Sequence, residues 1–269
     1  MDPRPVKKDV LGVLVDATTH DQALDAVLTA ARQQRPLAVT ALAVHGVMTG
    51  VLDREHGARL NSFDLVTPDG QPVRWALNLL HGAALTEPVC GPDLTLHVLR
   101  AAADEGLPVY LYGSTRQTLD LLMMNLQNSL PALKIAGHEP SGFRTARPGE
   151  DVEIADRITA SGARIVLVGL GCPRQEIFVH AMRPLLSMPL LAVGAAFDFH
   201  AGNLRRPPLW VRRAGLEWLW RLGLEPRRLW RRYLLLNPLY LMLLAGQWAG
   251  LRPAGPPRHT ADRPAGFPV

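Results

Sequence analysis

The sequence predicts an α/β body with a largely parallel sheet, followed by a basic helical appendage. Up to residue 203, short apolar runs alternate with helix-length segments, and strands separated by helices form right-handed βαβ units. Residues 204–269 hold 12 arginines, no lysine and three acidic residues, a net charge of +9, whereas residues 1–203 carry a net charge of −4. We therefore divide the chain into a body (1–203), a basic amphipathic appendage (204–250) and a Pro/Gly/Ala-rich tail (251–269) that is expected to be disordered.

The elements of the body follow from hydrophobic periodicity. Short apolar runs predict strands over residues 10–15, 37–44, 63–67, 109–112, 164–168 and 190–193. Apolar residues at helical spacing predict helices over 19–34 and 45–60, and Pro92 and Gly106 bound a third over 92–105. Two further helices are expected after 113–115 and from about Pro173. Ligands of parallel sheets bind beyond the carboxyl ends of the strands, which places the site among the loops 40–46, 67–71, 113–115, 169–175 and 194–203.

The cysteine content and the first residues of the chain indicate the compartment in which the protein acts. Two cysteines cannot form a disulfide scaffold and indicate a reducing compartment. The first residues, MDPRPVKKD, are polar and contain no apolar signal segment. A cytoplasmic protein is expected.

The segment VGLGCPRQE (168–176) joins a strand to a helix through Gly169 and Gly171. Free N–H groups at a helix start attract phosphate, and glycines let it approach the backbone. The alternative is a tight turn that binds nothing, because Arg174 occupies the third glycine position of the dinucleotide fingerprint. Cys172 is interpreted as a small turn residue rather than a reactive thiol.

Two acidic positions also follow strands. Asp69, in TPDGQP, could act as a general base, although an Asp-Gly pair is often only a turn. Asp198 and His200, in AAFDFHAGN, could contact a ribose, a base or a sugar, or simply bond within their loop. The sequence contains no Asp-x-Asp pair and no cluster with metal-ligand spacing, so no metal or other cofactor is expected, and a diphosphate would be bound by N–H groups and arginines.

The appendage combines arginine with tryptophan and leucine. Arg227, Arg228, Arg231 and Arg232 fall on one helical face, with Leu229 and other apolar residues elsewhere. This pattern is typical of a helix lying in a membrane surface. The apolar run 233–251 approaches the length of a membrane span, but its Asn-Pro pair favours two short helices. A solvated basic face and a nucleic-acid-binding surface are the alternatives. The appendage is rich in tryptophan and leucine and contains no lysine, which favours a membrane surface over nucleic acid.

Several segments together resemble the WecG/TagA/CpsF family of bacterial glycosyltransferases. They are TPDGQPVRWAL, GPDL, VYLYGST, VGLGCPRQE, VGAAFDFHAGNLRRPPLWVRRAGLEWLWRL and EPRRLWRRY, in order between about Val10 and Trp248. The resemblance implies a Rossmann-like body and a membrane-binding appendage. It also implies inverting transfer of a sugar from a UDP-sugar to a polyprenyl-diphosphate-linked saccharide, in polysaccharide or teichoic-acid-type assembly at the inner face of the cell membrane.

The resemblance assigns roles to residues of this chain. Asp69 would be the general base. It places Gln175 and Asp198 in the donor site, and the acceptor diphosphate would meet Arg221, Arg228 and Arg231. From the strand-end loops we expect Thr40, Gly70, Gly113, Gly169 and Gly171 to complete the donor site. Nucleic acid is not an expected partner, and a homo-oligomer is possible.

Two positions depart from the family pattern. Ala43, or Leu42 if the register shifts by one, stands where an Asn is usual, and Pro88 stands where an Arg is usual. These losses motivate an alternative, a catalytically inactive relative that binds the nucleotide-sugar or the lipid carrier.

Overall fold

The computed structural model describes residues 6–251 and 268–269, without the side chains of Arg228, Arg231 and Arg232. Most of the tail predicted to be disordered therefore lies outside the described residues. Pro268 and Val269 are described: Pro268 bridges Thr145, and Val269 is buried.

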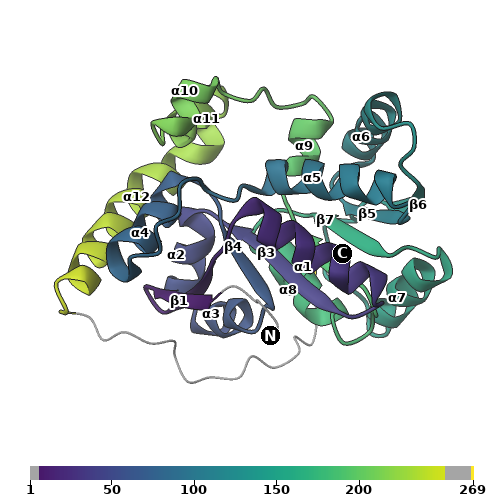
Figure 1. Cartoon of the computed structure of the whole chain (residues 1–269), viewed down its shortest axis with the longest axis horizontal. Coiled ribbons are helices and arrows are strands. Elements are labelled where there is room, and N and C mark those ends of the chain that lie inside the picture. Colours follow the sequence, from purple (N-terminus) through teal and green to yellow (C-terminus); the bar gives the residue numbers. More distant parts are fainter. Residues whose placement is uncertain (1–5, 252–267) are drawn as a thin grey trace.

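A six-stranded, fully parallel sheet forms the centre of the molecule (Figure 1), which confirms the predicted α/β class. The strand order is β4-β3-β8-β7-β5-β6. The strands are β3 (Leu37–Leu42), β4 (Leu65–Pro68), β5 (Val109–Gly113), β6 (Ile135–Glu139), β7 (Ile165–Gly169) and β8 (Pro189–Ala192).

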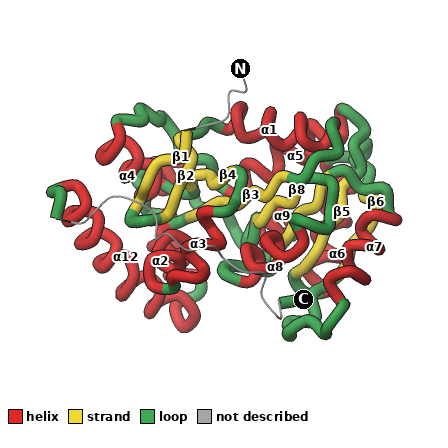
Figure 2. Tube along the Cα trace, turned by 90° about the horizontal axis from the view of Figure 1, so that it is seen from below, coloured by secondary structure: helices red, strands yellow, loops and turns green. Residues whose placement is uncertain are grey.

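Helices cover both faces of this sheet (Figure 2). In the body they are α1 (His20–Arg32), α2 (Val44–Leu52), α3 (Arg54–Asn61), α4 (Gln71–His81), α5 (Gly91–Asp104), α6 (Arg116–Ser129), α7 (Glu150–Ala160), α8 (Arg174–Met182) and α9 (Ala196–His200). The appendage adds α10 (Leu209–Arg213), α11 (Glu217–Leu224) and α12 (Pro226–Trp248).

Alternation along the strands explains the two layers. In β5, Tyr110 and Tyr112 belong to one apolar cluster and Val109 and Leu111 to the other. Successive side chains of a strand point to opposite faces, so continuous apolar strands such as these require cover on both sides.

The predicted strand 10–15 is wrong, because this segment turns. β1 (Val6–Val10) and β2 (Val13–Ala17) form an antiparallel hairpin in which Val10 pairs with Val13. Leu11 and Gly12 both have positive φ angles, 61° and 93°, which is the backbone region that two-residue hairpin turns use. An unbroken apolar run concealed the turn.

Two helix predictions also need correction. The helix expected over 45–60 is two helices, because Asp53 ends α2 and its side chain accepts the His56 N–H as the N-cap of α3. The two short helices expected around Asn237-Pro238 are one, since α12 continues through Pro238. Leu229, Tyr240 and Leu244 of α12 are buried, so packing against the body outweighs the local cost of proline.

Candidate active site

A cavity of about 720 Å³ lies where the body meets the appendage. One wall follows the carboxyl ends of β3 and β4 and includes Asp69 and Gly70. The opposite wall comes from α10, α11 and α12 and includes Arg221. The cavity therefore occupies the position expected for a ligand of a parallel sheet, closed on one side by the C-terminal helices.

Asp69 is held at the end of β4 by backbone contacts. Its N–H donates to the Leu42 carbonyl at 3.1 Å, and its carboxylate accepts from the Cys90 thiol and the Gly91 N–H. Burial raises the pKa of the Cys90 thiol, so Cys90 stays a donor. These contacts fix the carboxylate toward the cavity.

The acidity of Asp69 suits a general base. Burial raises its pKa to about 6, Glu217 adds to this effect, and Cys90, Arg221 and Gly91 oppose it. A carboxylate with this pKa is ionised at neutral pH and is a stronger base than an ordinary aspartate.

An ion-pair cluster attaches the appendage beside the cavity. Arg206 donates to both oxygens of Asp93 at 2.7 and 2.8 Å, and Arg212 donates to Asp93 Oδ2. Asp93 lies in the first turn of α5, where a negative charge is favoured. Burial opposes ionisation of Asp93, but the guanidinium groups outweigh it and lower its pKa.

Arg221 is the predicted acceptor arginine that the structure places in the cavity wall. Its guanidinium lies 5.9 Å from the centre of the Phe199 ring. Its Nε is buried and has no hydrogen-bond partner among the described residues. A buried arginine donor without a partner suits an anionic ligand. The side chains of Arg228 and Arg231 lie outside the described part of the chain, so their predicted roles are untested.

Thr40 and Gln175 do not line the cavity; they meet at a buried carboxyl group beside it. Thr40 Oγ1 and Gln175 Nε2 both donate to Glu176 Oε1, at 3.0 and 2.8 Å. Gln175 Oε1 in turn accepts the Gly171 N–H at 3.2 Å. Burial raises the pKa of Glu176. These hydrogen bonds join β3, the loop after β7 and the start of α8.

The predicted donor-site glycines have different surroundings. A Cβ on Gly169 would lie 2.5 Å from the Phe197 ring, and one on Gly113 would lie 2.8 Å from Leu170. Packing therefore explains both glycines. Gly171, with φ +77°, has open space around it. Asp198 accepts from Asn203 at 3.3 Å and lies outside the cavity wall.

Comparison with known proteins decides the family. Residues 8–254 match the Glycosyl transferase WecG/TagA/CpsF family. The chain belongs to this family. It is therefore a glycosyltransferase, as the sequence motifs predicted.

Two curated relatives carry the same name, N-acetylglucosaminyldiphosphoundecaprenol N-acetyl-beta-D-mannosaminyltransferase. The protein from Bacillus spizizenii (strain ATCC 23059 / NRRL B-14472 / W23) is 32% identical over 197 residues, which cover 73% of this chain and 74% of the relative. The protein from Bacillus subtilis (strain 168) is 30% identical over 195 residues, which cover 72% and 73%.

The two departures from the family pattern both lie in the cavity wall. Ala43 and Pro88 line it beside Asp69. Neither side chain can donate a hydrogen bond. In this chain the cavity wall therefore lacks the two side-chain donors that the family pattern places there.

The fold assembles one candidate metal-binding group among the described residues that the sequence spacing did not show. Ligand atoms of His56, Cys172 and Glu176 lie within 4.8 Å of one another. However, Arg59 donates to His56 Nδ1 at 3.1 Å, and burial with Arg59 lowers the His56 pKa to about 4. A neutral ring that accepts at Nδ1 carries its proton on Nε2, which leaves no lone pair there for a metal. The Arg59 contact therefore accounts for His56 Nδ1, whereas His56 Nε2 and Glu176 Oε2 are buried without a hydrogen-bond partner among the described residues.

Sequence patterns missed four groups of the site region: Cys90, Asp93, Glu176 and Glu217. Glu176 follows Gln175 directly, and Cys90 and Asp93 flank the predicted helix start at Pro92. Their neighbourhood was identified, but their partners come from distant segments that only folding brings together.

Proposed function

We propose that this protein transfers N-acetylmannosamine from its UDP derivative to N-acetylglucosaminyl diphosphoundecaprenol, with inversion and without a bound metal. The names of the two curated relatives support the acceptor and the transferred sugar. The observation that carries the proposal is the shared cavity, where Asp69 faces the appendage arginines.

In the proposed reaction, a hydroxyl oxygen of the acceptor attacks the anomeric carbon. Asp69 takes the hydroxyl proton, and the bond from that carbon to the UDP oxygen breaks. The start of α8, with the open Gly171 and the fixed Gln175, would hold the leaving diphosphate. Arg221, Arg228 and Arg231 would hold the acceptor diphosphate.

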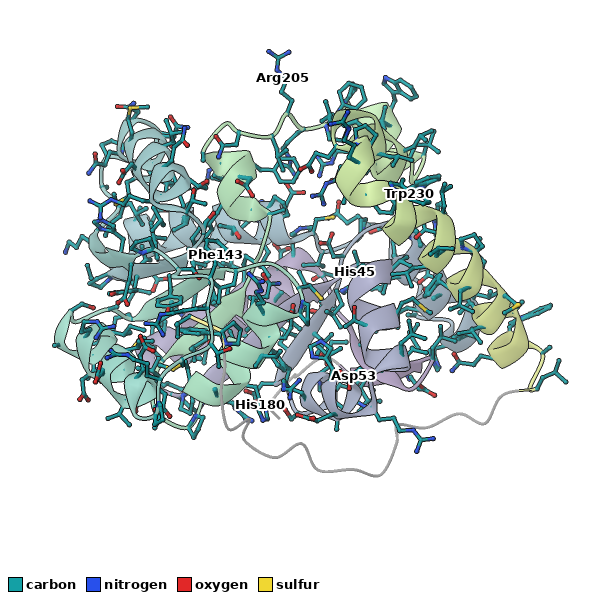
Figure 3. The ribbon with its side chains drawn as sticks, turned by 180° about the vertical axis from the view of Figure 1, so that it is seen from behind. His45, Asp53, Phe143, His180, Arg205 and Trp230 are labelled. Carbon is teal, nitrogen blue, oxygen red and sulfur yellow. The ribbon has the colours of Figure 1, made fainter. Side chains whose placement is uncertain are left out.

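We further propose that the enzyme lies on the inner face of the membrane, where it would meet its lipid-linked acceptor. Among the described residues, no helix has the length and apolar character to cross a bilayer. Instead, α10–α12 expose a set of apolar side chains: Leu209, Trp210, Leu219, Trp220, Leu224, Trp230, Leu234, Leu235, Leu241, Met242 and Trp248. Figure 3 shows Arg205 at one end of the molecule and Asp53 and His180 at the opposite end, with α12 running along the side between them. Exposed apolar residues among arginines favour an anionic membrane surface.

Turnover of UDP-sugars with a polyprenyl-diphosphate-N-acetylglucosamine acceptor tests the proposal. We expect UDP-N-acetylmannosamine to be used in preference to UDP-N-acetylglucosamine, with a β-linked product and no loss of rate in EDTA. Asp69→Asn should lower kcat by about 10²- to 10⁴-fold, the usual contribution of a general base, while UDP binding is retained. Full activity of Asp69→Asn would refute the base, and binding of UDP without turnover of any donor would favour an inactive relative.

A further inference from the structure

Two carboxylates from distant parts of the chain share the cavity. Asp69 comes from the end of β4, and Glu217 from the first turn of α11. Both line the cavity, and the half-buried Glu217 acts electrostatically on Asp69. Glu217 lies in the first turn of α11, where a negative charge is favoured.

The cations around this pair differ in what they contact. Arg212 is bonded to Asp93, and Arg74 donates to the carbonyls of Leu85 and Thr86. Arg221 is the cation that acts on Asp69, and its effect is smaller than that of Glu217. Arg206, which is bonded to Asp93, also interacts electrostatically with Glu217. The remaining titratable or charged side chains of the cavity wall come from α1, α2, α5, α10, α12 and the segment before α5: His20, His45, Glu87, His97, Arg213 and Tyr233.

We propose that Glu217 is a positioning residue for the transfer reaction, delivered by α11 beside Asp69 so that the base reaches full strength only while the appendage is docked. This inference rests on the proposed role of Asp69. A like charge nearby makes a carboxylate a stronger base. Docking of α11 would then do two things at once: it brings an arginine for the diphosphate and strengthens the group that activates the acceptor hydroxyl.

The coupling has a consequence for the donor. With α11 undocked, Asp69 loses both the neighbouring charge and part of its cover from water, so its basicity falls. A bound UDP-sugar would then be less exposed to base-assisted attack by water. Strengthening the base only when the acceptor side of the cavity is complete would favour transfer over hydrolysis.

The pH profile of kcat/KM for the full-length protein tests this inference. Protonation of Asp69, whose pKa is about 6, should reduce the rate as the pH falls through that value. In Glu217→Gln we expect the midpoint of this acid limb to move down by about one pH unit, and the rate at pH 8 to fall several-fold because the base is weaker. Glu217→Asp should restore part of the shift. Glu225→Gln, at the other end of α11 and outside the cavity wall, is the control and should leave the midpoint in place.

A readout without turnover separates the two proposals. The ¹³C carboxyl signal of Asp69, assigned by its loss in Asp69→Asn, should titrate at lower pH in Glu217→Gln than in the unmodified protein. An unchanged titration, with the helical circular dichroism retained, would overturn the role of Glu217 whether or not that variant is active. If Asp69→Asn keeps full turnover while the titration does shift, the pair exists but Asp69 is not the base.

Discussion

Two parts of the appendage meet the body in different ways. α12 places Leu229, Tyr240 and Leu244 in the core, and its Gln247 accepts the Leu11 N–H at 2.8 Å. α11, in contrast, buries no residue, and the segment before it is held through Asp93 and its arginines. We propose that α12 belongs to the folding unit of the body, whereas α10 and α11 form a docked wall. The cavity is complete only when this wall is in place.

The largest effect should come from breaking the α12 side of this comparison. Leu244 is 7% exposed and Leu241, three residues earlier, is 60% exposed. Leu244→Ala should lower the free energy of unfolding by about 2–4 kcal/mol, because it leaves a cavity in the core. Leu241→Ala should change it by less than about 0.5 kcal/mol. Urea unfolding of the two variants measures the difference, and equal effects would show that α12 is not part of the folding unit.

A loss of similar size is expected in the body at Glu176, which does not line the cavity. Glu176→Ala would leave the buried donors of Thr40 and Gln175 without an acceptor, at a cost of about 1–3 kcal/mol for each. Gln175 would lose its fixed orientation, so we expect UDP binding to weaken about tenfold, measured by calorimetry. Glu176→Gln keeps an acceptor oxygen and serves as the matched control, with binding within about threefold of the unmodified protein. Equal binding by both variants would argue against a role for Gln175 in the donor site.

The docked wall can be loosened through Asp93. Asp93→Asn removes the charge that holds Arg206 and Arg212, and a partly exposed pair of this kind contributes about 1 kcal/mol or somewhat more. We expect KM for the lipid acceptor to rise about five- to tenfold, while KM for the donor changes little. Because the contact is ionic, the acceptor KM of Asp93→Asn should depend less on salt concentration than that of the unmodified protein.

A control pair lies far from the cavity. Arg32 and Glu105 form a bidentate surface contact between α1 and the end of α5. Glu105→Gln should leave both KM values unchanged. If it raises acceptor KM as much as Asp93→Asn, general destabilisation rather than docking explains the effect.

The sequence could predict local features of the chain, but not contacts between segments that are far apart in it. Periodicity located the central strands because each alternates between two apolar layers, and the motif loops placed Asp69 and Gly70 at a strand end. Pairing across the chain was not visible: Thr40 with Glu176, or Asp93 with Arg206, joins segments that are far apart in sequence. The turn at Leu11-Gly12 and the continuity of α12 through Pro238 also depend on tertiary packing, which overrides local preference.

The smallest effect should appear at the exposed face of the appendage. Trp230, Leu234, Leu241 and Trp248 recur at spacings of four and seven residues, so they form a stripe on α12 away from its buried face. Trp248→Ala should weaken binding to anionic phospholipid vesicles by about 1 kcal/mol or several-fold, with unchanged stability. Leu52→Ala, an equally exposed apolar position on α2 (62% against 65% for Trp248), is the control. Trp248→Ala and Leu52→Ala should differ only if the α12 stripe faces the membrane. Equal sedimentation of the two variants with vesicles would therefore contradict the proposed membrane role of α12 and leave α10 and α11 as the surface to test.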